Sequence, residues 1–281
     1  MLQSADFDAL LVKNDGAPIK TLQPLVPHSA KIKALVLSAV TDSLSGLDRL
    51  TNLQVLDLGD ISPDRGISLA NLPQLWWLRL RWQNSLIPIG TSSFPALRSL
   101  SVLDPKSTTA EWVGDLKSLE TLELKGGTVG SLVGISAASS LRWLELRRVR
   151  GCSDVSPLKD VKLRHLRIES STDLSGLEDA LRGQRELEEL IVDSPTSFKA
   201  LEWVEANPKL RELLIKIDPS KVDLTKIVAQ RTLHAPSISY PSDQSLTDDQ
   251  IKAAVQVVGR KLKWIERGGT QKHPWCVIHL E

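Results

Sequence analysis

The block Leu-x-x-Leu-x-Leu recurs along this chain, with Ile, Val or Phe at some of its apolar positions. Its central leucine returns at intervals of 21 to 24 residues, at Leu35, Leu56, Leu78, Leu100, Leu122, Leu144, Leu166, Leu190 and Leu213. Apolar residues alternate at period two around each central leucine, which predicts a short strand with one buried face. About sixteen residues then return the chain to the next strand, so the strands must be parallel and joined by crossovers. Such repeats stack into a solenoid with one continuous core.

Three of the return segments have similar sequences: TDSLSGL (41–47), SDVSPLK (153–159) and TDLSGLE (172–178). With these turns, the repeats resemble the leucine-rich-repeat family and its 22-residue internalin and phosphatase-regulator subclass. The resemblance implies an α/β solenoid, a horseshoe with a parallel sheet on its concave side and a convex side that is irregular to helical.

The chain departs from this family at one position of the repeat. The usual repeat has an Asn three residues after the last strand leucine, where it hydrogen-bonds neighbouring coils. The residues found there are Val40, Ile61, Gln83, Pro105, Gly127, Val149, Ser171, Pro195 and Asp218. The backbone of these turns must therefore find other hydrogen-bond partners.

The later return segments, LEDALRGQRELEE and SFKALEWVEANPKLRE, are rich in helix-forming residues and carry apolar residues at helical spacing. We therefore expect helices on the convex side there. Trp112 and Trp203 fall in return segments, where we expect them to fill the core between coils.

We expect one domain over residues 1–281, with about nine to ten repeats in 31–235 between two caps. In the N-terminal cap, residues 1–30, Asp15-Gly16 stands between two apolar runs and predicts a hairpin. In the C-terminal cap, residues 236–281, Thr247 and Gln250 predict a capping box before an amphipathic helix over about 248–262. Residues 273–281 then read as a final strand.

Charge and cysteine content limit the partners and the compartment. The chain has 35 basic and 34 acidic residues, a formal charge of +1, which argues against nucleic-acid or membrane partners. No basic segment followed by an apolar run opens the sequence, and no run of 18 apolar residues occurs. Two cysteines are too few for the disulfide-stapled caps of a secreted repeat protein, so we expect a cytoplasmic protein.

No phosphate-binding loop, nucleophile elbow, dinucleotide-binding fingerprint or zinc-protease helix occurs in the sequence. We therefore expect a protein that is not an enzyme and has no cofactor, no metal and no small-molecule substrate. The alternative is an enzyme that uses His273, Cys276 and His279. Alternation along a strand opposes this alternative, because Cys276 would face away from both histidines. Cys152 reads as a small buried side chain.

The residues before, between and after the two strand leucines point away from the core, onto the concave sheet. This register, with Trp82 taken as an extension of the rim, predicts a partner-binding surface of Trp77, Arg79, Arg81, Trp82, Glu123, Lys125, Trp143, Glu145, Arg147, His165, Arg167 and Glu169. Exposed tryptophan beside arginine is typical of binding hot spots, which makes Trp77, Trp143 and Arg79 the expected anchors.

Two other interpretations of these residues remain open. The tryptophans could lie flat over their sheet neighbours with arginines stacked on them. The charges could also satisfy one another, because Glu145 with Arg167 and Arg147 with Glu169 are complementary across strands.

We expect a non-catalytic module whose concave sheet binds one folded protein. Unsecreted bacterial repeat proteins of this size resemble immunity proteins that neutralise a toxin, which implies a toxin as the partner. The resemblance to phosphatase regulators implies instead a regulatory or targeting subunit of a phosphatase or kinase. Both partner classes stay open on the sequence.

Overall fold

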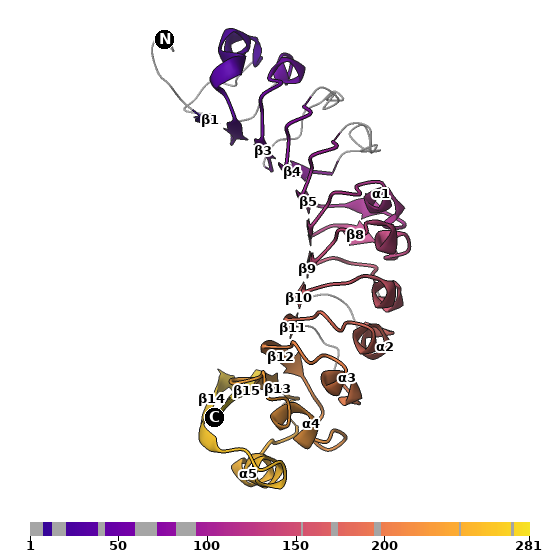
Figure 1. Cartoon of the computed structure of the whole chain (residues 1–281), viewed down its shortest axis with the longest axis vertical. Coiled ribbons are helices and arrows are strands. Elements are labelled where there is room, and N and C mark those ends of the chain that lie inside the picture. Colours follow the sequence, from indigo (N-terminus) through magenta and orange to yellow (C-terminus); the bar gives the residue numbers. More distant parts are fainter. Residues whose placement is uncertain are drawn as a thin grey trace.

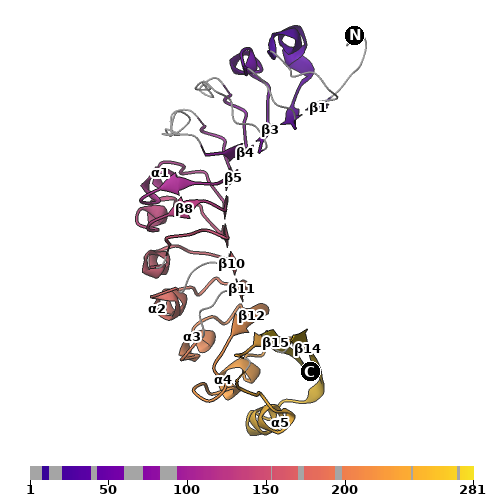
Figure 2. The same cartoon turned by 180° about the vertical axis from the view of Figure 1, so that it is seen from behind.

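The computed structural model describes residues 8–12, 21–38, 43–59, 72–82, 94–152, 154–169, 174–193, 198–241, 243–270 and 273–281. They form a long arc, with strands along its inner side and turns and helices along its outer side (Figure 1). Residues 8–12 and the C-terminal residues 273–281 lie at opposite ends of the arc, and the view from behind shows the same two layers (Figure 2). The predicted solenoid with a parallel concave sheet is confirmed.

Thirteen strands of the described residues form one sheet, in the order β1-β2-β3-β4-β5-β7-β9-β10-β11-β12-β13-β15-β14. Its parallel strands are β1 (Ala9–Val12), β2 (Ala34–Leu37), β3 (Val55–Leu58), β4 (Trp77–Arg81), β5 (Ser99–Leu103), β7 (Thr121–Lys125), β9 (Trp143–Arg147), β10 (His165–Glu169), β11 (Glu189–Asp193), β12 (Glu212–Lys216) and β13 (Ser237–Ser239). The sheet ends in an antiparallel hairpin of β14 (Leu262–Thr270) and β15 (His273–Leu280). A small second sheet pairs β6 (Lys106–Ser107) with β8 (Thr128–Val129).

The return segments contain short helices. Those of 3₁₀ type are η1 (Gln23–Lys31), η2 (Leu47–Arg49), η4 (Ile135–Ala137) and η5 (Ser156–Asp160). The α-helices are α1 (Glu111–Gly114), α2 (Leu177–Arg182), α3 (Glu202–Glu205), α4 (Thr225–Val228) and α5 (Asp248–Val257). The convex side thus becomes α-helical in the later repeats, as predicted. None of the helices in the described ranges combines the length and the apolar character needed to cross a membrane.

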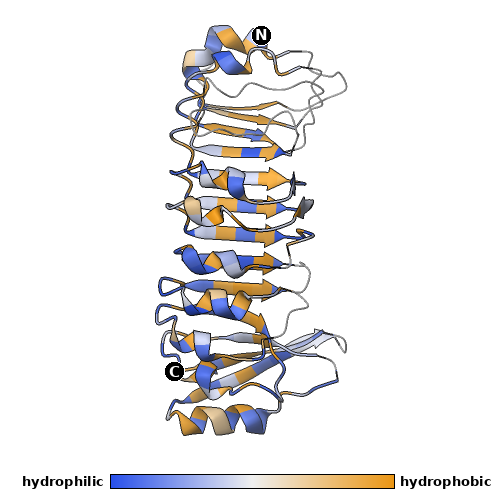
Figure 3. Cartoon of the chain, turned by 90° about the vertical axis from the view of Figure 1, so that its right-hand side faces the viewer, coloured by the Kyte–Doolittle hydropathy of each residue, from blue (hydrophilic) through white to orange (hydrophobic). Residues whose placement is uncertain are grey.

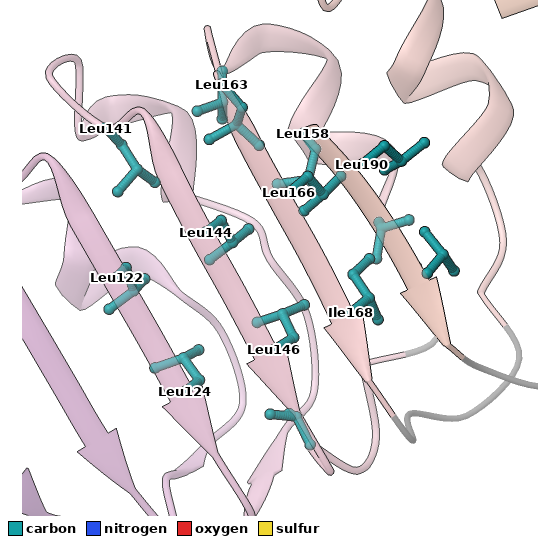
Figure 4. Close-up of a cluster of buried hydrophobic side chains, with 14 of the residues drawn as sticks. Leu122, Leu124, Leu141, Leu144, Leu146, Leu158, Leu163, Leu166, Ile168 and Leu190 are labelled. Carbon is teal, nitrogen blue, oxygen red and sulfur yellow. The ribbon is translucent and has the colours of Figure 1, made fainter. Parts of the chain in front are cut away.

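Leucines on the face of the sheet that is turned toward the helices and turns form the core. The central leucines Leu122, Leu144 and Leu166 pair in register on neighbouring strands, and none is more than 1% exposed. Their side chains point to the same side of the sheet in Figure 4, and Figure 3 shows apolar residues alternating with polar ones along the strands. Burying each leucine stabilises the fold by roughly 1.5–3 kcal/mol. The column of leucines therefore holds successive repeats together.

The small second sheet replaces the missing Asn ladder in the central repeats. The backbone N–H of Thr128 donates to the carbonyl oxygen of Pro105 (2.6 Å), and that of Arg150 donates to the carbonyl oxygen of Gly127 (3.1 Å). Pro105 and Gly127 occupy the position where the usual repeat has its Asn. Backbone hydrogen bonds thus satisfy N–H and C=O groups of the turns that an Asn side chain would otherwise hydrogen-bond.

In the later repeats, three amide side chains on the convex side, Gln184, Asn207 and Gln230, link successive coils. We call these three residues the amide row. Gln184 Nε2 donates to the carbonyl oxygen of Leu158 (2.6 Å), Asn207 Nδ2 to that of Leu181 (2.9 Å), and Gln230 Nε2 to that of Asn207 (2.9 Å). Gln184 and Asn207 are 2% and 0% exposed, so these hydrogen bonds lie inside the core. The amide row therefore ties each coil to the preceding one.

The C-terminal cap contains the predicted capping box, because Gln250 N–H donates to Thr247 Oγ1 and Thr247 N–H donates to Gln250 Oε1. Helix α5 ends at Val257, so our prediction of a helix to residue 262 was wrong. Gly259 has φ +65°, a left-handed conformation that ends a helix, and the chain then enters β14. The predicted final strand is β15, whereas the hairpin turn predicted at Asp15-Gly16 lies outside the described residues.

Candidate protein-binding surface

The concave side of the sheet carries most of the side chains that the sequence predicted for partner binding. Strands β4, β7, β9 and β10 present Trp77, Arg79, Arg81, Glu123, Lys125, Trp143, Glu145, Arg147, His165, Arg167 and Glu169 on the side opposite to the buried leucines. Lys125 is exposed and the others are half-buried. Strand β5 carries the smaller Ser99 and Ser101 between them, so the large side chains form two groups.

Trp82 does not lie on this face, and our prediction for it was wrong. It follows Arg81 and has the parity of Leu78 and Leu80, so its ring packs against the core. The rings of Trp82 and Trp112 meet edge to face, with centroids 5.3 Å apart. Trp112 thus packs partly buried against the core, and Trp203 is fully buried, as predicted.

On strand β4 the concave arginines are paired with aspartates of neighbouring repeats. Arg79 Nη1 lies 3.7 Å from Asp57 Oδ2, and Arg81 forms an ion pair with Asp104. The cross-strand neighbours of Trp77 are the smaller side chains of Val55 and Ser99. Trp77 is therefore the large apolar side chain of this group.

The second group is built around five charged residues of β7, β9 and β10, Glu123, Glu145, Arg147, Arg167 and Glu169, which we call the concave charge cluster. Arg147 Nε lies 2.9 Å from Glu169 Oε2 and 3.2 Å from Glu145 Oε1, and Arg147 Nη1 lies 3.9 Å from Glu123 Oε1. Arg167 Nη2 lies 2.5 Å from Glu169 Oε1, and its Nε lies 3.7 Å from Glu145 Oε1. The predicted cross-strand pairs thus form, and each charge of the cluster has an ion-pair partner, although three glutamates against two arginines leave one negative charge in excess.

The cluster shifts the pKa values of two of its glutamates in opposite directions. Burial is the main cause that raises the pKa of Glu145, and the attraction of Arg147 opposes it only in part. Burial alone would also raise the pKa of Glu169. Hydrogen bonds from Arg147 and Arg167 outweigh that effect and hold the pKa of Glu169 below its ordinary value.

We therefore expect Glu145 to titrate above, and Glu169 below, the ordinary glutamate pKa of about 4.3 in an NMR titration of the side-chain carboxyl carbons. A pKa lowered by folding means that ionised Glu169 stabilises the fold above the unfolded pKa, and that this stabilisation is lost as the pH falls. Arg147→Ala should raise the pKa of Glu169, whereas Arg98→Ala, immediately before β5, should leave it unchanged. Equal pKa values for the two glutamates would contradict the paired geometry.

Trp143 is stacked on the neighbouring strand, although not on an arginine. Its ring and that of His165 lie with centroids 4.4 Å apart and planes at 25°. His165 Nδ1 lies 3.1 Å from Glu189 Oε2, so the next strand holds the imidazole in place. Trp143 therefore lies flat against a sheet neighbour, as the first of the two other interpretations allowed, and still keeps accessible surface.

The C-terminal hairpin extends the concave face beyond the last repeat, which sequence reasoning missed (Figure 1). Ser239 on β13 pairs with Trp275 on β15, and His279 on β15 pairs with Trp264 on β14. The rings of Trp264 and His279 stack with centroids 4.2 Å apart, and Trp264 is 55% exposed. His273, Trp275 and His279 share one face of the final strand, and this alternation is the sequence signal that could have predicted the surface.

A groove of about 830 Å³ lies along the edge of the sheet where the strands begin. It is lined by Gln74, Trp76, Pro95, Ala96, Arg98, Ser99, Ser118, Glu120, Thr121 and Ser140. Trp76 is 43% exposed there, immediately before strand β4. Strand alternation alone would have placed Trp76 in the core, so no sequence pattern predicted this exposure.

The C-terminal histidines and Cys276 do not form a reactive pair in the structure. Cys276 is 0% exposed, and burial raises the pKa of its thiol to about 11. His279 stacks on Trp264 on the other side of the sheet, and its Nε2 lies 3.5 Å from Glu266 Oε2. Within the described ranges, no group of three or more His, Cys, Asp or Glu residues could hold a metal ion. Burial also raises the pKa of Cys152 to about 11.

Comparison with known proteins places this geometry among leucine-rich repeats. No family model and no curated protein matches the chain. An internalin of Listeria monocytogenes, InlF, is similar in structure, with 18% identity over 79% of this chain and 78% of that chain and a TM-score of 0.50. A leucine-rich-repeat protein of Leptospira interrogans has 16% identity over 89% of this chain and 82% of that chain, also with a TM-score of 0.50. The protein therefore has the leucine-rich-repeat fold that its repeats predict.

Proposed function

We propose that this protein is a non-catalytic binding module whose concave face holds one folded partner protein. The observation that carries the proposal is the pair of half-buried tryptophans, Trp77 and Trp143, on the concave side of the sheet. Tryptophan is enriched at binding hot spots, where its ring fills a pocket on the partner. The polar residues that we expect to surround these anchors are Arg79, Arg81, Glu123, Lys125, Glu145, Arg147, His165, Arg167 and Glu169.

The charges of this face favour a protein over a nucleic acid as the partner. Arg147 and Arg167 are already paired with glutamates, so they do not form the continuous positive groove that a phosphate backbone requires. Paired charges also hold their side chains in fixed positions, and a pre-ordered surface loses little conformational entropy on binding. Such a surface suits a partner of fixed shape.

Within this proposal we favour a toxin as the partner, which the protein would neutralise by covering its surface, as the resemblance to immunity proteins implies. A phosphatase or kinase would instead identify the protein as a regulatory or targeting subunit. Cys152 and Cys276 are both buried and free, which supports our further proposal that the protein acts in the cytoplasm.

Site-specific photo-crosslinking in the cell of origin tests the proposal. A photoreactive amino acid in place of Ser99, between the two tryptophans on the concave side, should capture one predominant protein, which mass spectrometry then identifies. The matched control places the same amino acid at Val133, which is 48% exposed in a return segment on the convex side. Equal capture from both positions would contradict binding by the concave face.

A further inference from the structure

Four basic residues lie along the edge of the sheet where the central strands end. We call Lys106, Lys125, Arg148 and Arg150 the basic edge, and all four are exposed. Lys106 pairs with Thr128 in the small second sheet, and Thr128 forms a parallel bridge with Arg150. Adjacent strands lie about 4.8 Å apart, so Lys106 and Arg150 stand roughly 10 Å apart. The basic edge therefore gathers side chains from three neighbouring repeats into one patch beside the concave face.

The positive charge of this patch is uncompensated. In the described part of the chain, no carboxylate forms an ion pair with any of its four side chains. Two acidic residues close to it in the sheet have other partners, because Asp104 pairs with Arg81 and Glu123 with Arg147. The chain as a whole carries only +1. Four unpaired positive charges therefore concentrate on one patch of a chain that is almost neutral overall.

The opposite edge of the sheet, where the strands begin, is built differently. Several of its basic residues pair with an acidic residue of an adjacent repeat, in Arg98–Glu120 (3.8 Å), Arg164–Glu188 (3.9 Å) and Lys209–Glu186 (2.5 Å). Ion pairs between adjacent repeats thus form at this edge, whereas none forms with the four residues of the basic edge in the described part of the chain.

The backbone at Arg148 is a second, independent observation. Asp104, Gly126 and Arg148 occupy the same position in successive repeats, and all three have left-handed backbones, with φ of 49°, 71° and 54°. Glycine adopts this conformation without strain, whereas a long side chain rarely does. A Cβ at Gly126 would also lie 2.6 Å from Asp104 Oδ1, so the Asp104 side chain would have to move. Strained residues cluster at functional sites, so the arginine at position 148 points to a use for its charge.

We propose that the basic edge binds an acidic segment of the protein held by the concave face, an inference that rests on the proposed function. Charge complementarity selects this occupant, because carboxylates would supply the counter-charges that the chain itself lacks. Lys106 and Arg150 stand roughly 10 Å apart, and a few carboxylates of one loop can span this distance. A nucleic acid fits less well, because the glutamates of the concave charge cluster lie beside the patch. Moreover, the exposed tryptophans of the described ranges, Trp76 and Trp264, lie elsewhere.

A fluorescently labelled peptide of ten glutamates serves as the probe, with its binding measured by anisotropy. The test variant carries Lys106→Ala, Lys125→Ala, Arg148→Gly and Arg150→Ala. The matched control removes the same charge elsewhere, with Lys159→Ala, Lys162→Ala, Arg185→Ala and Arg211→Ala. At about 20 mM NaCl we expect the test variant to bind the peptide at least about tenfold more weakly than the unmodified protein, and the control to bind within about twofold of it.

The single variant Arg148→Gly should fold normally, because glycine adopts the left-handed backbone without strain. It removes one of the four positive charges, so we expect it to bind the peptide about threefold more weakly than the unmodified protein. Equal weakening by test and control variants, or no binding by the unmodified protein, would overturn the proposal. Tighter binding of a ten-nucleotide oligothymidylate than of the peptide would also overturn the proposal.

The peptide experiment is independent of the crosslinking experiment, because the peptide does not replace the partner of the concave face. A failed crosslinking experiment therefore leaves the peptide result standing, and a failed peptide experiment leaves the concave proposal standing.

Discussion

Replacing Trp143 by alanine should weaken binding of the partner protein about 30-fold, which corresponds to about 2 kcal/mol. The change removes the largest apolar side chain of the second concave group and also the ring on which His165 stacks. Trp143 stands on the solvent side of β9, while the adjacent Leu144 is 0% exposed and unaffected. The fold should therefore survive, and calorimetric titration with the identified partner measures the effect.

The matched control for this prediction is Trp76→Ala. Trp76 is also accessible, at 43% exposure, but it lies in the groove at the edge of the sheet rather than on the concave face. Its loss should change the affinity less than about twofold, because hot-spot energy is concentrated in a few central residues. Equal losses for the two variants would mean that the concave face is not the binding surface.

Replacing Asn207 by alanine should lower the free energy of unfolding by about 3 kcal/mol, because two carbonyl groups would lose a hydrogen-bond donor inside the core. Asn207 is 0% exposed, and its Nδ2 donates to the carbonyl oxygens of Leu181 (2.9 Å) and Trp203 (2.5 Å). Leu181 belongs to the preceding coil, so the change also cuts a link between repeats. Urea denaturation followed by circular dichroism measures the loss.

Asn52→Ala is the control for the amide row. Asn52 Nδ2 also donates to a carbonyl oxygen of the preceding coil, that of Ala30 (3.3 Å), but at the exposed surface. Water can replace this hydrogen bond, so we expect a loss below about 1 kcal/mol. If both variants unfolded at the same urea concentration, the amide row would not hold the later coils together.

Much of the candidate surface could be predicted because strand alternation assigns side chains to faces. Trp77, Trp143 and the five residues of the concave charge cluster lie on the face that the register predicted. The cross-strand pairs Glu145–Arg167 and Arg147–Glu169 could also be predicted, because a constant repeat length brings equivalent positions side by side.

The positions of three other tryptophans could not be predicted from the sequence, because they depend on where the alternation of buried and exposed side chains begins and ends. Trp82 was assigned to the rim, yet the strand parity continues through it and turns it toward the core. Trp76 precedes its strand and is exposed, although alternation would bury it. Trp264 belongs to a hairpin that forms only because β15 pairs with both β13 and β14.

The repeat pattern was sufficient to predict the solenoid, its parallel register and the face on which most strand residues lie. A period-two pattern repeated about every 22 residues allows only one way to bury its leucines. The contacts between folded repeats decide which charges neutralise one another, which remain uncompensated along the basic edge, and which backbone groups and amides link successive coils without an Asn ladder. These outcomes depend on distances between side chains of different repeats, and those distances follow from turn geometry and local backbone conformation rather than from spacing along the chain.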